Sequence, residues 1–137
     1  MRIIPWWKNN FKISKHFSVW EVTNGDSKRI PKPKSIEERN ILLLAGELDK
    51  VRDAWGGAIG VTSWYRPPNV NKAVGGVPNS QHILGNAADI FNVHGDQLDF
   101  EKWLDLFWGD RALGYGVRSG RGFTHLDLRV GRIRWDY

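Results

Sequence analysis

The stretch SIEERNILLLAGELDKVRDAWGG, residues 35–57, is the part of the sequence that most constrains the fold. Ser35 is followed three residues later by Glu38, which is the pattern of a capping box at a helix start. Gly56 and Gly57 end the pattern, as glycine often does just after a helix. Apolar side chains recur between these ends at approximately helical spacing: Ile36, Leu43, Leu44, Leu48, Val51 and Trp55. We therefore expect a helix over residues 36–54 that buries one face.

Short segments rich in β-branched and aromatic residues follow this helix. They predict strands at residues 58–65, 86–93, 111–117, 122–130 and 132–137. A second helix is expected over residues 96–108, where Leu98, Trp103, Leu104, Phe107 and Trp108 have mixed helical spacing. Residues 66–80 contain adjacent prolines and a glycine pair, so we expect a loop there. The order of elements predicts an α+β fold with helices flanking a mostly antiparallel central sheet.

Composition limits the domain organisation and the chemistry. The chain has 137 residues, 41% of them hydrophobic, which suits a single domain over residues 1–137 with its own core. Residues 1–34, punctuated by Pro5, Pro31 and Pro33, are expected to be an irregular segment packed on that domain. The sequence has no cysteine, so any zinc would have to be held by histidine and carboxylate groups.

Charge and hydropathy bear on partners and location. The N-terminus MRIIPWWKNNFKISKHF has no apolar run of signal-peptide length, and no segment approaches a membrane span. We expect a protein made in the cytoplasm without a standard export signal. The net charge of +5 favours anionic polymers without separating nucleic acid from cell wall. Basic residues are scattered and no recognition motif appears, so a small nucleic-acid binder is the weaker alternative and no nucleic-acid partner is expected.

The predicted strand FTHLDLRV has two different faces, because side chains alternate along a strand. One face carries Thr124, Leu126, Leu128 and Val130 and is expected to meet the core. The other face carries His125, Asp127 and Arg129. Such a polar row is either plain surface or the floor of an active site.

The stretch NSQHILGNAADI, residues 79–90, places His82 seven residues before Asp89, with small residues between them. Gly85 permits a tight backbone path beside them. With His125, these residues make a set of two histidines and one carboxylate, and three protein ligands with an open position are typical of catalytic zinc. The alternative is a histidine satisfied in a turn, with Asp89 as a cap or ion-pair partner.

Several motifs resemble one known family. SQHILGNAAD is similar to the S-x-H-x-x-G-x-A-x-D motif of the zinc D-Ala-D-Ala carboxypeptidases, which are peptidases of bacterial peptidoglycan. SWYR resembles the upstream S-x-Y-R segment of that family, and FTHLDLR resembles its H-x-D segment. NKAVGGVPNSQH resembles the lead-in of the small bacterial and phage-associated branch. Order and gaps agree over roughly residues 17–135, and the hedgehog signalling domain has a similar fold.

The resemblance implies roles for individual residues. His82, Asp89 and His125 match the zinc ligands, and Arg66 matches an arginine that contacts the substrate carbonyl or carboxylate. Ser80 matches the motif serine and is expected to brace the loop beside the substrate. The alternative for Arg66 is a salt bridge that holds the proline-containing loop.

One departure concerns the general base. Many members have Glu or Asp three residues before the last ligand, or His two before it, where this chain has Gly122 and Phe123. Asp127 is the nearest carboxylate on the face of His125, and either activates the zinc-bound water or orients a ligand imidazole. Glu21 is a further carboxylate that no pattern places. The remaining histidines, His16 and His94, are expected on the surface.

The resemblance implies a zinc-dependent hydrolase of an amide bond in peptidoglycan stem peptides or cross-links. A wall hydrolase without an export signal fits a monomeric, phage endolysin-like protein released through a holin-type pore, and lysis favours an endopeptidase over a carboxypeptidase. The loop from Pro67 to Asn79 is expected to form one pocket wall, whose shape selects the bond. The main alternative is a non-catalytic zinc-containing module of the same fold that binds cell wall or a partner protein.

Overall fold

The fold is built on one five-stranded sheet, described by a computed structural model over residues 3–137. The strands are β1 (Ile59–Ser63), β2 (Ala87–Asn92), β3 (Arg111–Tyr115), β4 (Thr124–Val130) and β5 (Arg134–Asp136). They lie in the order β1-β2-β4-β3-β5, and every pairing is antiparallel except that between β3 and β5. The prediction of an α+β domain with a mostly antiparallel sheet and flanking helices is confirmed.

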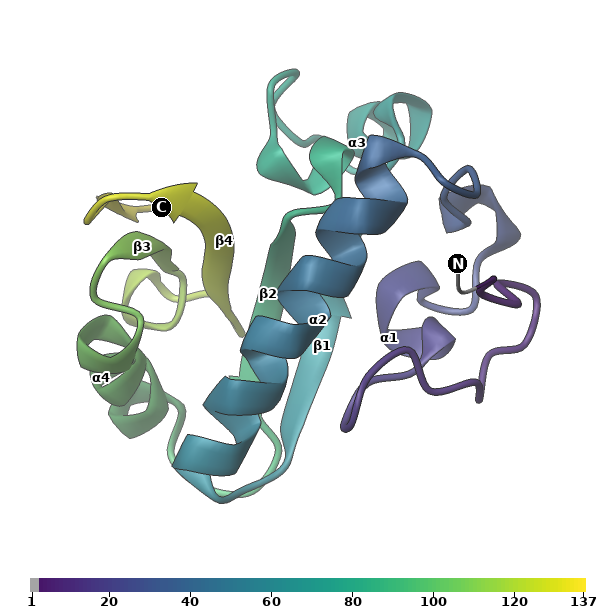
Figure 1. Cartoon of the computed structure of the whole chain (residues 1–137). Coiled ribbons are helices and arrows are strands. Elements are labelled where there is room, and N and C mark those ends of the chain that lie inside the picture. The colour runs from purple at the N-terminus through teal and green to yellow at the C-terminus, as the bar shows by residue number, and fades with distance from the viewer. Residues whose placement is uncertain (1–2) are drawn as a thin grey trace.

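Helix α2 (Ile36–Trp55) crosses the sheet in front of β1 and β2 (Figure 1). Ser35 caps its start by accepting a hydrogen bond from the backbone N–H of Glu38, and Gly56 ends it in the left-handed conformation. The predicted apolar stripe is wrong at Ile36 and Leu43, which are 65% and 54% exposed. Steps of three and four residues select the buried face instead: Ile41, Leu44, Ala45, Leu48 and Val51.

The N-terminal segment packs against the opposite end of the core from α4, as Figure 1 shows. It contains a short helix, α1 (Val19–Thr23), and a 3-10 turn, η1 (Ser27–Arg29), where the sequence predicts irregular structure. Its buried apolar side chains join the main core: Ile4, Trp6, Ile13, Phe17, Val19 and Val22. The Trp6 indole N–H also donates to Glu38 at 2.7 Å, which ties the segment to α2.

Residues 66–80 are less irregular than the sequence predicts. Helix α3 (Pro68–Ala73) begins within the expected loop, because a proline in the first turn has the φ angle a helix needs and loses no required hydrogen bond. A 3-10 turn, η2 (Gln81–Leu84), follows and leads into β2. The preceding strand is also shorter than predicted, so Trp64, Tyr65 and Arg66 form a connection rather than the end of β1.

The second predicted helix is confirmed as α4 (Gln97–Phe107), which Figure 1 shows beside β3. Phe100 and Leu104 are fully buried, while Leu98 and Phe107 of the predicted stripe are exposed. A last 3-10 turn, η3 (Val117–Ser119), connects β3 to the approach to β4. Among residues 3–137, no helix is both long and apolar enough to cross a membrane.

Alternation along β2 and β4 separates the core from a polar face. Ala88, Ile90 and Leu126 join the hydrophobic core. Asp89 and His125 therefore point to the other side of the sheet. The prediction that the β4 face with Thr124, Leu126, Leu128 and Val130 meets the core is wrong at Val130, which is 87% exposed because it lies beyond a register shift at the sheet end.

Candidate metal centre

Strand pairing brings two of the candidate ligands together. Asp89 on β2 and His125 on β4 are direct partners in the antiparallel ladder. Directly opposed residues have Cβ atoms about 5 Å apart on the same face of the sheet. Their side chains meet although the two residues are 36 positions apart in the sequence.

The turn η2 supplies the third candidate ligand, His82. Ser80 caps this turn by accepting the His82 backbone N–H at 3.2 Å, and Gly85 closes it with φ of 76°. A Cβ atom on Gly85 would lie 2.7 Å from the backbone oxygen of Glu37 in α2. Glycine at this position therefore lets η2 pack closely on α2, which aims His82 at the sheet.

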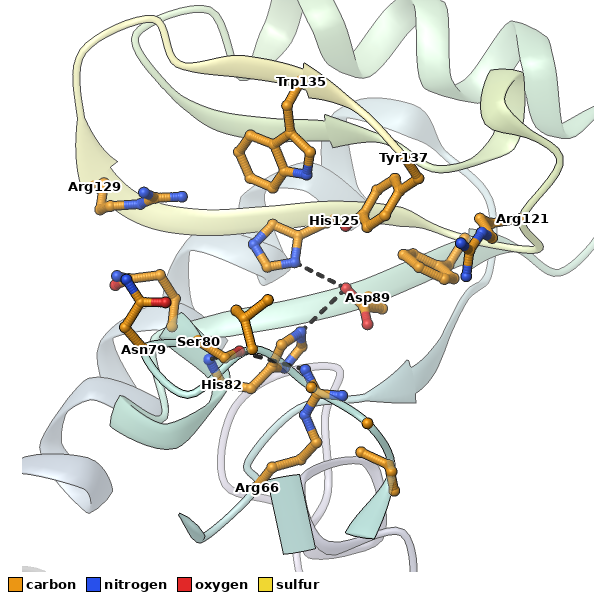
Figure 2. A pocket seen from close by; sticks show the side chains of 16 residues that line it. Arg66, Asn79, Ser80, His82, Asp89, Arg121, His125, Arg129, Trp135 and Tyr137 are labelled. Atoms are coloured by element: carbon orange, nitrogen blue, oxygen red, sulfur yellow. Dashed lines mark hydrogen bonds and ion pairs between the residues drawn. The ribbon is translucent and has the colours of Figure 1, made fainter. Parts of the chain in front are cut away.

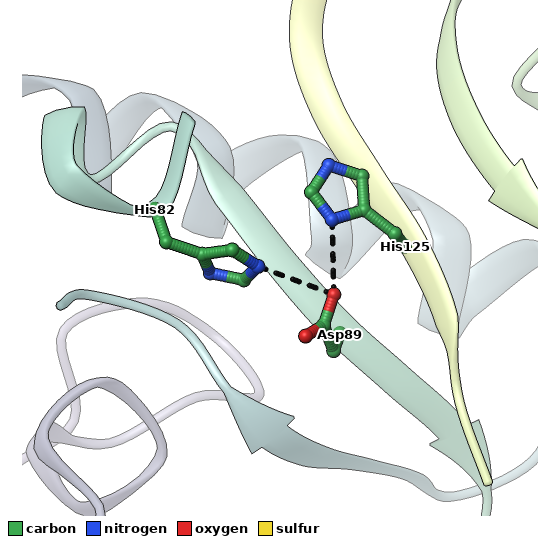
Figure 3. Close-up of side chains that lie close together, drawn as sticks. All are labelled: His82, Asp89 and His125. Atoms are coloured by element: carbon green, nitrogen blue, oxygen red, sulfur yellow. Dashed lines mark hydrogen bonds and ion pairs between the residues drawn. The ribbon is translucent and has the colours of Figure 1, made fainter. Parts of the chain in front are cut away.

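The three ligand atoms converge in a buried position, as Figure 3 shows. The Asp89 Oδ1 atom lies 3.2 Å from His82 Nε2 and 3.0 Å from His125 Nδ1. All three ligand atoms lie within 4.8 Å of one another. Ligands of a tetrahedral zinc ion lie about 3.4 Å apart, given metal–ligand distances of about 2.1 Å. The spacing therefore suits a small divalent cation.

The opposite nitrogen of each imidazole has its own partner. His82 Nδ1 lies 2.6 Å from the backbone oxygen of Trp64, which can only accept, so this nitrogen carries the hydrogen. His125 Nε2 lies 2.8 Å from Asp127 Oδ2. When each imidazole is neutral and carries its hydrogen on the outer nitrogen, as in a metal site, the inner nitrogens present lone pairs toward the same point as the Asp89 carboxylate. Lone pairs that converge on one point with no hydrogen between them are the arrangement that binds a cation. Two imidazole nitrogens and one carboxylate oxygen are ligand atoms that suit zinc.

Asp127 lies behind His125 and is fully buried. Its Oδ1 and Oδ2 atoms each accept a hydrogen bond of 3.0 Å from the Arg129 guanidinium, and Oδ1 also accepts the Arg129 backbone N–H. Burial would raise the pKa of Asp127, but His125 and Arg129 lower it to about 2. Burial would also raise the pKa of Asp89, but in the metal-free site hydrogen bonds and positive charge from His82 and His125 hold the pKa of this carboxyl well below its usual range. Both carboxylates are therefore ionised at neutral pH.

A cavity of about 710 Å³ opens over the three candidate ligands (Figure 2). Arg66 lines it and donates from Nη2 to Ser80 Oγ at 3.4 Å. The buried Nε of Arg66 has no hydrogen-bond partner among the described residues. The predicted salt-bridge alternative for Arg66 is absent from the ion pairs of residues 3–137. One side of the cavity is formed by residues 74–77 and Asn79, which lie within the predicted wall, and by Ser80 and Gln81, which lie just beyond it.

The other predicted residues lie away from the cavity. Asp127 is outside its lining, and Gly122 is exposed on the approach to β4. The Glu21 carboxylate accepts the backbone N–H and hydroxyl of Ser18 at the start of α1. His94 is exposed as predicted, whereas His16 is partly buried and pairs with Asp53 at 2.7 Å.

The opposite wall of the cavity was not predicted. It includes Arg121, Phe123, Trp135 and Tyr137. The Trp135 ring meets His125 edge-on at a centroid distance of 5.0 Å, and Gly114 leaves room for it, because a Cβ there would lie 2.6 Å from the indole. Alternation along RIRWDY places Trp135 and Tyr137 on one face, which is the signal that sequence reasoning could have used.

A comparison with protein-family models complements this geometry. The model of the peptidase M15 family matches residues 15–127. The chain belongs to the peptidase M15 family. Its members are peptidases and are typically zinc-dependent, in agreement with a buried His82, Asp89 and His125 group that could hold a metal ion. No curated protein matches the chain. The match to the family model contains all three candidate ligands and ends before β5.

Proposed function

We propose that the protein is a zinc-dependent peptidase that hydrolyses an amide bond in peptidoglycan stem peptides or cross-links. One observation carries the proposal: His82, Asp89 and His125 converge at the floor of a cavity that Arg66 also lines. Membership of the M15 family supports a reaction at a peptide bond. The resemblance of residues 80–89 to the D-Ala-D-Ala carboxypeptidase motif supports the choice of substrate.

In this proposal, zinc supplies Lewis-acid chemistry when it is bound, by activating water and polarising the scissile carbonyl. Arg66 binds the carbonyl oxygen and stabilises the negative charge that develops on it during hydrolysis. Its Nη2 makes only one long contact, to Ser80 Oγ at 3.4 Å, so the guanidinium keeps donors available for a substrate oxygen. Ser80 positions both groups, because the same hydroxyl contacts Arg66 and caps the turn that carries His82.

We assign Asp127 the orienting role rather than that of general base. Its carboxylate contacts the outer nitrogen of His125 and is held by Arg129 on the other side. It is fully buried, so substrate and water do not reach it from the cavity. A carboxylate behind a ligand histidine holds the ring orientation and raises its basicity toward a metal.

A non-catalytic zinc-containing module is the second candidate, and one observation favours it. Asp89 is the only side-chain carboxylate among the described residues that line the cavity, so no other side-chain carboxylate is available there to act as a base. In that case, the same site would hold zinc as a structural ion, and the cavity would bind cell wall or a partner protein.

The proposed enzyme activity also suggests where the protein acts. We propose a monomeric, endolysin-like endopeptidase, made in the cytoplasm and released to the wall through a holin-type pore. The net charge of +5 would help the protein bind the anionic wall, an attraction that salt weakens.

The test is mass spectrometry of purified peptidoglycan after incubation with zinc-loaded protein, beside a His82→Ala variant. New peptide termini that are absent with the variant and after chelation support the peptidase, and their masses identify the bond as terminal or internal. If folded, zinc-loaded protein produces no new termini but still sediments with the wall, the binding module replaces the peptidase.

A further inference from the structure

Arg121 presents an unused cation to the cavity. It lies on the approach to β4, it lines the cavity, and its side chain is exposed. Within residues 3–137, no carboxylate pairs with its guanidinium, which instead lies over the Tyr137 ring at 5.6 Å from the centroid. The nearby Arg118 differs, because it pairs with Asp136 at 2.8 Å. Arg121 is therefore free to bind an anion.

Tyr137 lines the same wall of the cavity as this cation and carries a hydroxyl group. Its ring packs edge-on against Phe123 at 5.4 Å, and its backbone N–H donates to Ser119 Oγ at 3.1 Å. Partial burial raises the pKa of Tyr137, so the hydroxyl remains protonated at neutral pH and can donate. Figure 2 shows Arg121 on the opposite side of Asp89 from Arg129, with the Tyr137 ring above Asp89 in this view.

The charged side chains that line the cavity give the wall near Arg121 a net positive charge. Among the side chains that line the cavity, three arginines face one carboxylate, Asp89. Arg129 is neutralised by Asp127, but Arg66 and Arg121 have no such partner among the described residues. Zinc would add further positive charge at the floor. An anionic group of the substrate is therefore favoured between the metal centre and Arg121.

We propose that Arg121 and Tyr137 form a carboxylate-binding subsite beside the metal centre, which selects peptides with a free carboxylate close to the scissile amide. This inference rests on the proposed peptidase function. The guanidinium fork matches a carboxylate, and the Tyr137 hydroxyl adds a second donor. The carboxylate has two possible sources in a stem peptide: the terminal D-Ala, or the free carboxylate of a γ-linked D-Glu.

The test compares four synthetic stem peptides that carry a carboxylate or a carboxamide at each of these two positions. Wild-type protein should favour one carboxylate over its carboxamide by roughly 10- to 100-fold in kcat/KM, the effect of a charge-assisted hydrogen bond. The preferred position identifies the source. Arg121→Gln should bring this ratio close to one, and Tyr137→Phe should reduce it less. Arg52→Gln, which removes the same charge from α2, should leave it unchanged.

Two results would overturn the subsite: equal kcat/KM for all four peptides with wild-type protein, or an Arg121→Gln variant that keeps the wild-type ratio. Calorimetric binding of the same peptides provides a readout that does not need turnover. If no peptide is hydrolysed, the peptidase proposal fails, yet tighter binding of one carboxylate peptide that depends on Arg121 still supports the subsite. Equal binding of all peptides by wild-type protein rejects it.

Discussion

At the scale of single residues, His125 is held from two sides, by Asp89 at Nδ1 and by Asp127 at Nε2. Asp127→Asn keeps the shape of the side chain but removes the charge that holds the ring. We expect the zinc affinity to fall roughly 10- to 100-fold, as is usual for a residue behind a metal ligand. Competition with a chromophoric chelator measures this loss.

Kinetics at saturating zinc then separate the two roles of Asp127. An orienting residue predicts that excess zinc restores much of the activity of Asp127→Asn. A general base predicts a large fall in kcat with zinc affinity unchanged, and that result would return Asp127 to the catalytic role. His82→Ala is the control that should lose both zinc and activity.

Asp105 provides a pH test away from the metal centre. Burial would raise its pKa, but hydrogen bonds from Arg134, Tyr115 and Arg132 lower it below the usual value. Because the folded-state pKa is depressed, the stabilisation is present above the unfolded-state pKa and is lost as pH falls through the folded-state pKa. We expect Asp105→Asn to reduce the free energy of unfolding by about 1–3 kcal/mol at neutral pH.

Urea unfolding at a series of pH values checks this expectation. The difference between wild-type protein and Asp105→Asn should shrink as the solution is acidified. A difference that stays constant with pH would show that packing rather than charge is responsible. Asp136→Asn, whose pair with Arg118 is exposed on both sides, should have a smaller effect at neutral pH.

At the scale of elements, the site depends on how η2 packs on α2. Gly85→Ala introduces both a left-handed conformation for alanine and a Cβ close to the Glu37 backbone. Gly56→Ala is the matched control, since Gly56 has φ of 79° but no neighbour within 4 Å of a Cβ. We expect Gly56→Ala to cost about 1 kcal/mol of unfolding free energy and Gly85→Ala about 2–4 kcal/mol.

The two variants should also differ at the metal centre. Displacement of η2 would move His82, so Gly85→Ala should bind zinc more weakly, whereas Gly56→Ala should bind it as tightly as wild-type protein. Thermal unfolding and chelator competition measure the two effects separately. Equal stability and equal zinc affinity for both variants would mean that η2 adapts without moving the ligand.

The sequence does not predict the structure of residues 66–80 or the pairing of β5. Turn-forming residues predict a loop over residues 66–80, but the six-residue helix α3 forms inside it. A proline in the first turn favours this short helix. The expected last strand exists as β5, yet its sequence does not reveal that it pairs in parallel with β3 and presents Trp135 to the site.

At the scale of the whole molecule, metal binding should stabilise the fold. The candidate ligands come from η2, β2 and β4, so a bound ion would link segments distant in the sequence. At a zinc concentration 100 times the Kd, the stabilisation is about 2.7 kcal/mol. We expect a chelator to lower the Tm by several degrees and zinc to restore it. In calorimetry, His82→Ala should lack this response, and an equal zinc-induced rise in the variant would place the ion elsewhere.

The sequence by itself determined the features that depend on near neighbours. The capped start of α2, its glycine stop and the alternation along β4 are local patterns, and each predicts its element. The set of His82, Asp89 and His125 was also identifiable, because two separate motifs resemble those of a metallopeptidase family, although spacing alone left a histidine in a turn as the alternative. The capping, glycine and alternation signals involve residues a few positions apart, whose backbone geometry is set by short-range sterics and hydrogen bonds.

Only the tertiary structure decided the rest. Strand pairing placed Asp89 opposite His125, and packing buried Asp127 behind that ring instead of exposing it to the cavity. Packing of α2 on the sheet buries Ile41 and leaves Leu43 exposed. The folding of the C-terminal strands brings Arg121 and Tyr137 to the cavity wall opposite Arg66. The physical reason is that these contacts join distant segments, so they follow from the register of the sheet and the shape of the core.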